Sequence, residues 1–181
     1  MLKQMMAERG RKVRLAAGEF VFHQGDGDES VYGVERGLLK AFYTQPDGRE
    51  FIKSIVPAGA FIASLNALVG NGECTFSLAA IEDCELLALP YRELRGAASE
   101  DLEIARDLIG LLAELASRKE RREYQLLCMS AEERYELFLE ESGGNPDWLS
   151  QADLAAYLGI TPQALSRIKR RRRERKQIRG S

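Results

Sequence analysis

The sequence has very few residues of the kinds that bind metal ions or form disulfide frameworks. Of its 181 residues only His23 is a histidine, and three are cysteines. Cys74, Cys84 and Cys128 lack the close spacing of metal-binding or redox motifs, so we predict buried or half-buried thiols. A jelly-roll enzyme of the cupin type needs a cluster of metal-binding histidines, which this chain cannot supply. We therefore expect neither enzymatic activity nor a metal or other cofactor.

Long apolar runs are also missing. No stretch of about 18 uninterrupted apolar residues occurs, and residues 1–9 lack the apolar core of a secretory signal. These absences predict a cytoplasmic protein with no membrane partner. A length of 181 residues with 45% hydrophobic content suits one full domain and a smaller appendage.

The charges are distributed unevenly along the chain. Residues 151–181 contain nine Lys or Arg against Asp153 and Glu174, a net charge of +7. Because the total is −2, the other 150 residues carry −2 minus +7, or −9. A basic C-terminal segment on an otherwise acidic protein is typical of DNA contact through that segment, because DNA attracts the basic charges and repels the acidic remainder.

Between residues 12 and 90, short runs rich in Val, Phe, Ile and Tyr alternate with polar turns that contain glycine. The clearest hairpin joins residues 38–43 to residues 50–56 through Pro46-Asp47-Gly48. Proline presets such a turn, and glycine permits a positive φ. The pattern indicates an antiparallel β-sandwich or barrel, and we expect a sandwich.

Good helix formers follow from residue 99 to about residue 129, and Ser99 can cap this helix. Its apolar residues form two stripes, so the helix needs two partners. One face can pack on the sandwich, whereas the stripe with spacings of four, three and four fits a helix paired with its symmetry mate. We assign this dimer stripe to Ile104, Leu108, Leu111 and Leu115. A helix buried inside a monomer is the alternative. The mixed charges at 118–123 indicate a solvated part of the helix.

The last part of the chain has the pattern of a helix-turn-helix. Ser130 and Glu133 have the spacing of a capping box, which predicts a new helix. Ser150 can cap a short helix, and Gly159 stands where the chain must turn sharply. Thr161 then caps a second helix with proline at its first position. The inward positions are Leu154, Ala155, Leu158, Ile160, Leu165 and Ile168. An αα-hairpin used only for packing is the alternative.

A second helix lying in the major groove would present its outward N-terminal residues to the base edges. Gln163, Ser166 and Arg167 are those residues, and glutamine pairs with adenine as arginine pairs with guanine. We expect a further set of residues to contact DNA phosphates, which gives affinity without sequence information. That set is Thr161, Lys169, Arg170, Arg171, Arg172 and Arg173. A solvated tail is the alternative for the last basic residues.

The order of sandwich, long helix, capped helix and helix-turn-helix resembles the Crp-Fnr family of bacterial regulators. Matching stretches include Gly18-Glu-Phe-Val-Phe-His-Gln-Gly-Asp26, Pro57-Ala-Gly-Ala-Phe-Ile62, Glu132-Glu-Arg134 and Leu158-Gly-Ile-Thr161. The resemblance covers nearly the whole chain. It implies a jelly-roll sensor domain, a homodimer formed through the long helix, and base reading at Gln163, Ser166 and Arg167. The family commonly has Glu at the position of Gln163.

Two departures from the family pattern limit what the resemblance implies. Members that bind cyclic nucleotides carry a Gly-Glu-Leu turn and a later Arg-Ser or Arg-Thr, whereas here those places hold residues 63–65 and Cys74-Thr75. A buried cyclic phosphate would lack its charge partner, which predicts weak or no binding of cyclic AMP. Ser64, Cys74 and Thr75 would line an effector pocket for an unknown ligand, with core packing the alternative for Cys74. We also expect no counterpart of the family's C-terminal β-hairpin wing, whose phosphate contacts the basic tail at 171–181 would replace.

We therefore predict an α+β protein with an antiparallel jelly-roll sensor at 1–98, a dimerisation helix at 99–129 and a helix-turn-helix domain with a basic tail at 130–181. Its expected function is sequence-specific regulation of transcription without control by cyclic AMP. The expected partners are double-stranded DNA and a second copy, and RNA polymerase is a candidate third. The alternative is a nucleotide-sensing regulatory subunit that docks a protein partner and does not bind DNA.

Overall fold

The computed structural model describes residues 1–70, 72–144 and 148–179, without the side chains of residues 176, 178 and 179. The chain folds into two compact units, and the boundary between them falls between Arg121 and Arg122. Helix α4 (Leu102–Cys128) is continuous across this boundary, so the first unit ends within it. The predicted division had placed the boundaries at 98/99 and at 129/130.

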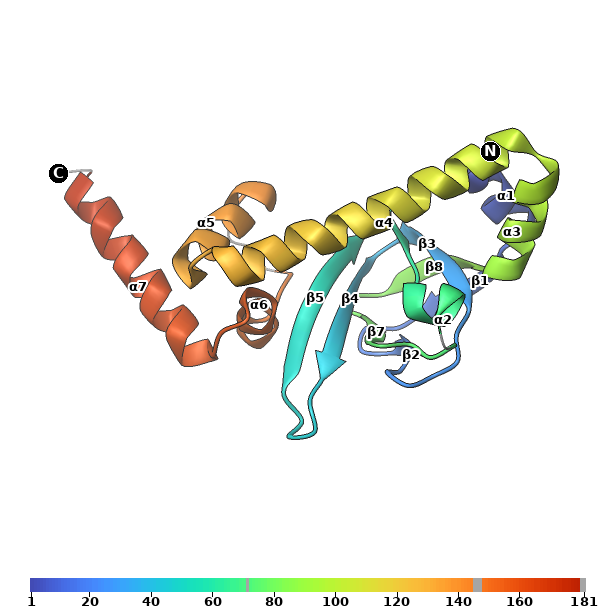
Figure 1. Ribbon diagram of the computed structural model, residues 1–181. Coiled ribbons are helices and arrows are strands. Elements are labelled where there is room, and N and C mark those ends of the chain that lie inside the picture. The colour runs from blue at the N-terminus through green and yellow to red at the C-terminus, as the bar shows by residue number, and fades with distance from the viewer. Residues whose placement is uncertain (71, 145–147, 180–181) are drawn as a thin grey trace. The chain divides into compact units, whose positions relative to one another are not determined.

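The first unit contains a sandwich of two antiparallel four-stranded sheets (Figure 1). Its strands are β1 (Arg11–Leu15), β2 (Phe20–Phe22), β3 (Ser30–Arg36), β4 (Leu38–Thr44), β5 (Glu50–Pro57), β6 (Phe61–Ile62), β7 (Ser77–Ala80) and β8 (Cys84–Pro90). One sheet has the order β1-β8-β3-β6 and the other the order β2-β7-β4-β5. The predicted jelly roll is confirmed.

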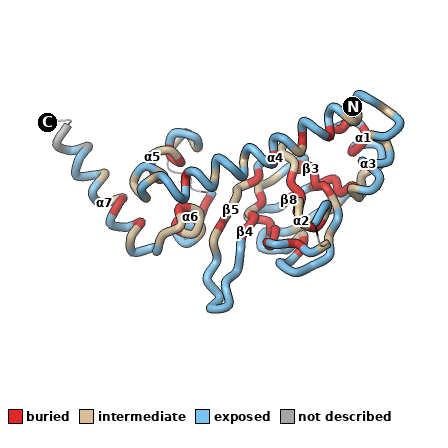
Figure 2. Tube along the Cα trace, in the orientation of Figure 1, coloured by how far each residue is buried: buried red, intermediate tan, exposed pale blue. Residues whose placement is uncertain are grey.

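The predicted hairpin is the β4–β5 pair, in which Leu38 lies opposite Pro57 and Thr44 opposite Glu50. Gly48 turns with φ of 82°, a conformation that a side chain would strain. Apolar residues of both sheets fill the space between them, including Phe22, Leu39, Leu78 and Leu86. Figure 2 shows that buried residues concentrate in the strands, whereas much of α4 is exposed.

A second apolar cluster lies in the first unit, where helices cover strands β3 and β8. The helices of this unit are α1 (Leu2–Arg9), α2 (Leu65–Val69), α3 (Tyr91–Glu100) and the first part of α4. Met6 of α1, Leu94 of α3 and Leu111 of α4 meet Val31 and Leu89 of the sheet. Helices α1, α2 and α3 were not predicted from the sequence, for which no helix was expected before residue 99.

The long helix begins three residues later than predicted. Ser99 does not cap it, because Ser99 lies inside α3 and donates its hydroxyl to the carbonyl of Gly96. Asp101 separates the two helices, with backbone φ of −129° and ψ of 115°. Its carboxylate accepts hydrogen bonds from the backbone N–H groups of Glu103 at 2.8 Å and Ile104 at 3.2 Å, as a capping residue does.

The stripe predicted to form the dimer seam packs inside the protomer instead. Leu108, Leu111 and Leu115 are buried in the second cluster, and Ile104 is half-buried against it. The sandwich and α1 therefore already cover this face, and the prediction for these four residues is wrong. The other predicted stripe consists of Leu102, Ile109 and Leu112. Leu102 is 66% and Ile109 67% exposed, whereas Leu112 is half-buried against the same cluster.

The second unit is helical over its described residues outside the connecting turns. After the end of α4 it contains α5 (Ala131–Glu141), α6 (Gln151–Leu158) and α7 (Pro162–Arg179). Tyr135 and Phe138 of α5 pack inward as predicted, whereas Leu137 is half-buried. Across the described residues of both units, none of the helices combines the length and the apolar character that a membrane span requires.

Candidate nucleic-acid interface

Helices α6 and α7 form the predicted helix-turn-helix. Gly159 joins them in the left-handed conformation, with φ of 67° and ψ of 33°. The turn requires glycine for its backbone conformation, and a Cβ at this position would also stand 3.2 Å from the side chain of Leu126, which would have to shift slightly. The buried residues between the helices are Leu154, Ala155, Leu158, Leu165 and Ile168, and Ile160 is half-buried.

The two predicted caps orient the helices. The hydroxyl of Ser150 accepts from the backbone N–H of Asp153 at 3.0 Å, and that of Thr161 accepts from Ala164 at 3.2 Å. Pro162 is the first residue of α7, where its missing N–H costs no helical hydrogen bond. These caps hold the first turns of α6 and α7 in place, while the buried apolar contacts between the two helices hold them together.

The residues predicted to read bases lie on the open face of α7. Gln163, Ser166 and Arg167 are all exposed, whereas Leu165 and Ile168 on the opposite side are buried. The spacing of three and four residues places the three polar side chains on one helical face. Their hydrogen-bonding groups are thus presented together to anything that meets this side of the helix.

The predicted phosphate residues separate into two groups. Arg170 and Arg173 point outward, and Arg170 forms a within-helix pair with Glu174 at 3.8 Å. Lys169 is half-buried, and its ammonium donates to the side-chain oxygen of Gln151 at 2.6 Å. Burial, with the nearby charge of Arg173, holds the pKa of Lys169 below its usual value.

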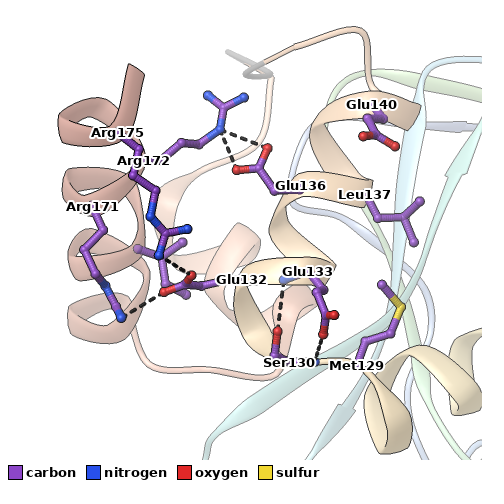
Figure 3. A pocket seen from close by; sticks show the side chains of 11 residues that line it. Met129, Ser130, Glu132, Glu133, Glu136, Leu137, Glu140, Arg171, Arg172 and Arg175 are labelled. Carbon is purple, nitrogen blue, oxygen red and sulfur yellow. Dashed lines mark hydrogen bonds and ion pairs between the residues drawn. The ribbon is translucent and has the colours of Figure 1, made fainter. Parts of the chain in front are cut away.

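Arg171 and Arg172 instead turn toward α5, where Glu132 and Glu136 meet them (Figure 3). The segment from residue 171 to residue 179 is also no separate tail, because α7 continues through it without a break. Arginines on a continuous helix point in directions fixed by the helical period, so consecutive residues cannot all face one surface.

Arg134 is a positioning residue to which the sequence reasoning gave no role. Its guanidinium donates to the carbonyl of Leu158 at 2.9 Å, at the end of α6, and to that of Met129 at 2.5 Å. A longer contact of 3.4 Å reaches the carbonyl of Gln125 in α4. The carbonyls of Leu158 and Met129 lie at helix ends, where helical partners run out, whereas that of Gln125 also accepts from the backbone N–H of Met129 at 3.3 Å. One side chain thus joins three helices of the unit. The motif Glu132-Glu-Arg134 was the only sequence signal for it.

Arg122 was predicted to be solvated but is largely enclosed. Its guanidinium carbon stands 4.1 Å from the centre of the Tyr157 ring, and it donates to the carbonyl of Tyr157 and to the side chain of Gln125 at 3.1 Å. Burial lowers the pKa of Arg122.

Cys128 was predicted to be buried or half-buried, but its thiol is exposed.

Comparison with known proteins agrees with this arrangement. The model of the cyclic nucleotide-binding domain family matches residues 12–101. The cyclic AMP receptor protein of Thermus thermophilus is 30% identical over 158 residues, which cover 83% of this chain and 71% of that protein. The chain belongs to the Crp-Fnr family of transcription regulators.

Other Crp-Fnr proteins match over similar lengths. The nitrogen fixation regulation protein FixK of Bradyrhizobium diazoefficiens is 27% identical, with 87% of this chain and 70% of that protein covered. The transcriptional activator protein Anr of Pseudomonas protegens is 29% identical, with coverage of 90% and 70%. Among solved structures, FixK2 from Bradyrhizobium japonicum superimposes with a TM-score of 0.78 at 22% identity, covering 92% of this chain and 86% of that one, which shows the same fold.

In this Crp-Fnr chain the residues predicted to line an effector pocket are largely engaged by the protein itself. Ser64 is buried and caps α2, accepting from the backbone N–H of Ala67. Cys74 is buried, with its sulfur 3.7 Å from the carbonyl oxygen of Asp28. Thr75 is exposed, so it does not share their buried environment.

Lys53 lies close to this region and was missed by the sequence reasoning. It is the extra residue of a β-bulge, because Ile52 pairs with Phe42 while Ser54 pairs with Ala41. Its ammonium nitrogen is 3.9 Å from the centre of the Phe76 ring. Burial first, and then the charges of Lys119 and Arg118, lower its pKa to about 8.

Replacing Lys53 with methionine is expected to stabilise the protein at neutral pH. The folded protein releases the Lys53 proton near pH 8 and the unfolded chain near 10.5, so the unfolded chain holds more protons between these values. The cost of the buried charge is complete below pH 8 and disappears as the pH rises toward 10.5. We expect Lys53→Met to raise Tm by about 2–4 °C at pH 7, the shift that accompanies about 1 kcal/mol, and by less at pH 9.5.

Thermal melting at the two pH values tests this expectation. Lys12→Met, at an exposed position of β1, is the matched control and should leave Tm unchanged at both values. An equal Tm for Lys53→Met and the parent protein at pH 7 would show that the Phe76 ring and solvent fully offset the cost of burying the Lys53 charge.

Proposed function

We propose that the protein binds a two-fold-related DNA site as a homodimer and reads it with Gln163, Ser166 and Arg167. The observation that carries the proposal is the open face of α7. Its reading residues are exposed together, while two caps, a left-handed glycine and a buried apolar face fix the helix behind them. A helix held in this way can enter a major groove with its side chains prearranged.

The side chains on this face suit the edges of base pairs. An amide can donate to and accept from adenine, a guanidinium can donate twice to guanine, and a hydroxyl can serve a base or a phosphate. The guanidinium groups of Arg170 and Arg173 point outward on the same helix and can contact the phosphates on either side. Thr161, at the start of α7, can also reach a phosphate.

The exposed stripe of α4 supports a homodimer. Leu102, Ile109 and Leu127 are 66%, 67% and 76% exposed, and Ala113 and Ala116 are exposed between them. At 100° per residue these five positions lie on one side of the helix, away from Leu108 and Leu111. Paired helices of two copies would cover this side and generate the two-fold axis that a palindromic site requires.

The proposed regulator does not respond to cyclic AMP. Ser64 caps a helix and Cys74 contacts a carbonyl oxygen, and neither can neutralise a phosphate. Binding to chromosomal DNA would place the protein in the cytoplasm. RNA polymerase is a further partner that regulation of this kind implies.

Alanine at position 167 is expected to weaken binding to a selected DNA site by about 1–3 kcal/mol and to relax the preference at one base-pair position. The reason is that a guanidinium paired with guanine discriminates against other bases. Fluorescence anisotropy with a duplex series, each altered at one position, measures both effects. The control is Arg173→Ala, which should weaken binding to all duplexes similarly. A uniform loss for Arg167→Ala would assign this side chain to the phosphates.

A further inference from the structure

Three arginines of α7 are paired with two carboxylates of α5 rather than left open. Arg171 lies 2.9 Å and Arg175 3.3 Å from the carboxylate of Glu132. The Nε of Arg172 lies 2.8 and 3.0 Å from the two oxygens of Glu136. Figure 3 shows these side chains reaching across from α7 to α5. We call these five residues the Glu–Arg ladder.

The ladder is accessible to solvent. The side chains of Glu132 and Glu136 are 33% and 49% exposed, and those of the three arginines 32–69%. Ion pairs at such exposure are weak, and water and salt compete with them. A DNA phosphate offers a guanidinium the same bidentate geometry as a carboxylate, and neighbouring phosphates add to its negative charge. The arginines can therefore exchange Glu132 and Glu136 for phosphates at small cost.

A groove beside the reading face brings the ladder close to Arg167. It has a volume of about 400 Å³ and lies between the start of α5 and the first half of α7. Its charged lining consists of Glu132, Arg167 and Arg171, beside Ser130 and Ala131 at the start of α5. A phosphate in this groove would meet two guanidinium groups and one opposing carboxylate. The carboxylate of Glu132 therefore repels anions at the border of the proposed DNA-binding face.

We propose that Glu132 and Glu136 are specificity-determining residues, because they act as internal counter-anions that reduce the affinity of α7 for DNA of any sequence. The inference rests on the proposed DNA binding. Binding to DNA of unrelated sequence comes mostly from phosphates, whereas a cognate site also engages Gln163, Ser166 and Arg167, which the ladder leaves free. Because Glu132 and Glu136 compete with phosphates for Arg171, Arg172 and Arg175, they weaken binding to unrelated DNA proportionally more than binding to the cognate site.

The test uses the full chain carrying Glu132→Gln or Glu136→Gln. Affinity for a selected duplex and for a scrambled duplex is measured by anisotropy from 50 to 300 mM KCl. We expect Glu132→Gln to tighten binding to the scrambled duplex about three- to tenfold near 150 mM salt and binding to the selected duplex about twofold. The slope of log affinity against log salt should steepen by about 1–2, because two freed arginines take up further phosphates. Glu136→Gln frees one arginine and should steepen it by about 1.

Glu140→Gln is the matched control, because Glu140 lies on α5, is exposed, and forms no ion pair within the described residues. The substitution has the same chemistry and charge change, and the affinity should change less than twofold. Equal effects at positions 132 and 140 would show that net charge alone matters and would overturn the inference. Weaker binding of Glu132→Gln would also overturn it and would indicate that the ladder orients α7. If the parent protein binds neither duplex at 50 mM salt, the proposed function itself fails.

Discussion

Ile109→Glu is expected to separate the homodimer into monomers and to weaken binding to a palindromic site at least about a hundredfold. Ile109 is 67% exposed on α4, in the apolar stripe that includes Leu102 and Leu127. In a symmetric helix pair each substitution occurs twice, so the interface would lose two apolar contacts and bury two carboxylates. A monomer engages one half-site without the gain in effective concentration that a second half-site provides.

The protomer itself should tolerate this change. Ile109 does not belong to the buried cluster that Leu108 and Leu111 form with the sandwich, so a charge there meets solvent. Val69→Glu is the control, because Val69 is equally exposed, at 69%, but lies on α2. Light scattering after size exclusion gives the mass, and anisotropy gives the affinity. A dimer that persists in Ile109→Glu at micromolar concentration would place the interface elsewhere.

The second large effect is expected for Arg134→Met, which should destabilise the helix-turn-helix unit by about 2–4 kcal/mol. Methionine keeps much of the volume but cannot donate to the carbonyls of Leu158, Met129 and Gln125. Each partly buried carbonyl left without a donor costs about 1–3 kcal/mol unless water reaches it. Because Arg134 joins the ends of α4 and α6, its loss should also misplace α7 and weaken DNA binding.

The single tryptophan makes this effect measurable. Trp148 belongs to the second unit and packs edge-on against Phe138, with ring centres 6.4 Å apart. Urea denaturation followed by its fluorescence therefore reports on that unit, while far-UV circular dichroism reports on both. Arg121→Met, at an exposed position of α4, is the control and should leave the midpoint unchanged. A midpoint for Arg134→Met equal to that of the parent would show that water replaces the guanidinium without cost.

The helix-turn-helix could be predicted in detail because its signals are local. Each cap bonds to a backbone N–H three residues away, and Gly159 is needed where the backbone turns. The β4–β5 hairpin was predictable for the same reason, since its turn residues lie next to the strands that they join. The jelly roll followed from the alternation of strands and turns together with the family resemblance.

The choice between the two stripes of α4 could not be made from the sequence. Both have helical spacing, and which one is buried depends on contacts with Met6 of α1 and Val31 of β3, distant in the sequence. The sequence likewise did not reveal that Arg134 would meet carbonyls of two other helices. Composition showed that α7 is basic, but helical geometry decided that Arg171, Arg172 and Arg175 face α5.

The proposed DNA reading by α7 is tested most directly by selecting bound sequences from random duplex DNA at near-physiological salt, without added ligand. The parent protein should enrich a palindrome whose half-site centres lie about one helical turn, about 34 Å, apart. The Arg167→Ala protein should enrich the same palindrome with a weakened preference at one position of each half-site. Failure of the parent protein to enrich any sequence, in a preparation shown to be folded and dimeric, would contradict the account.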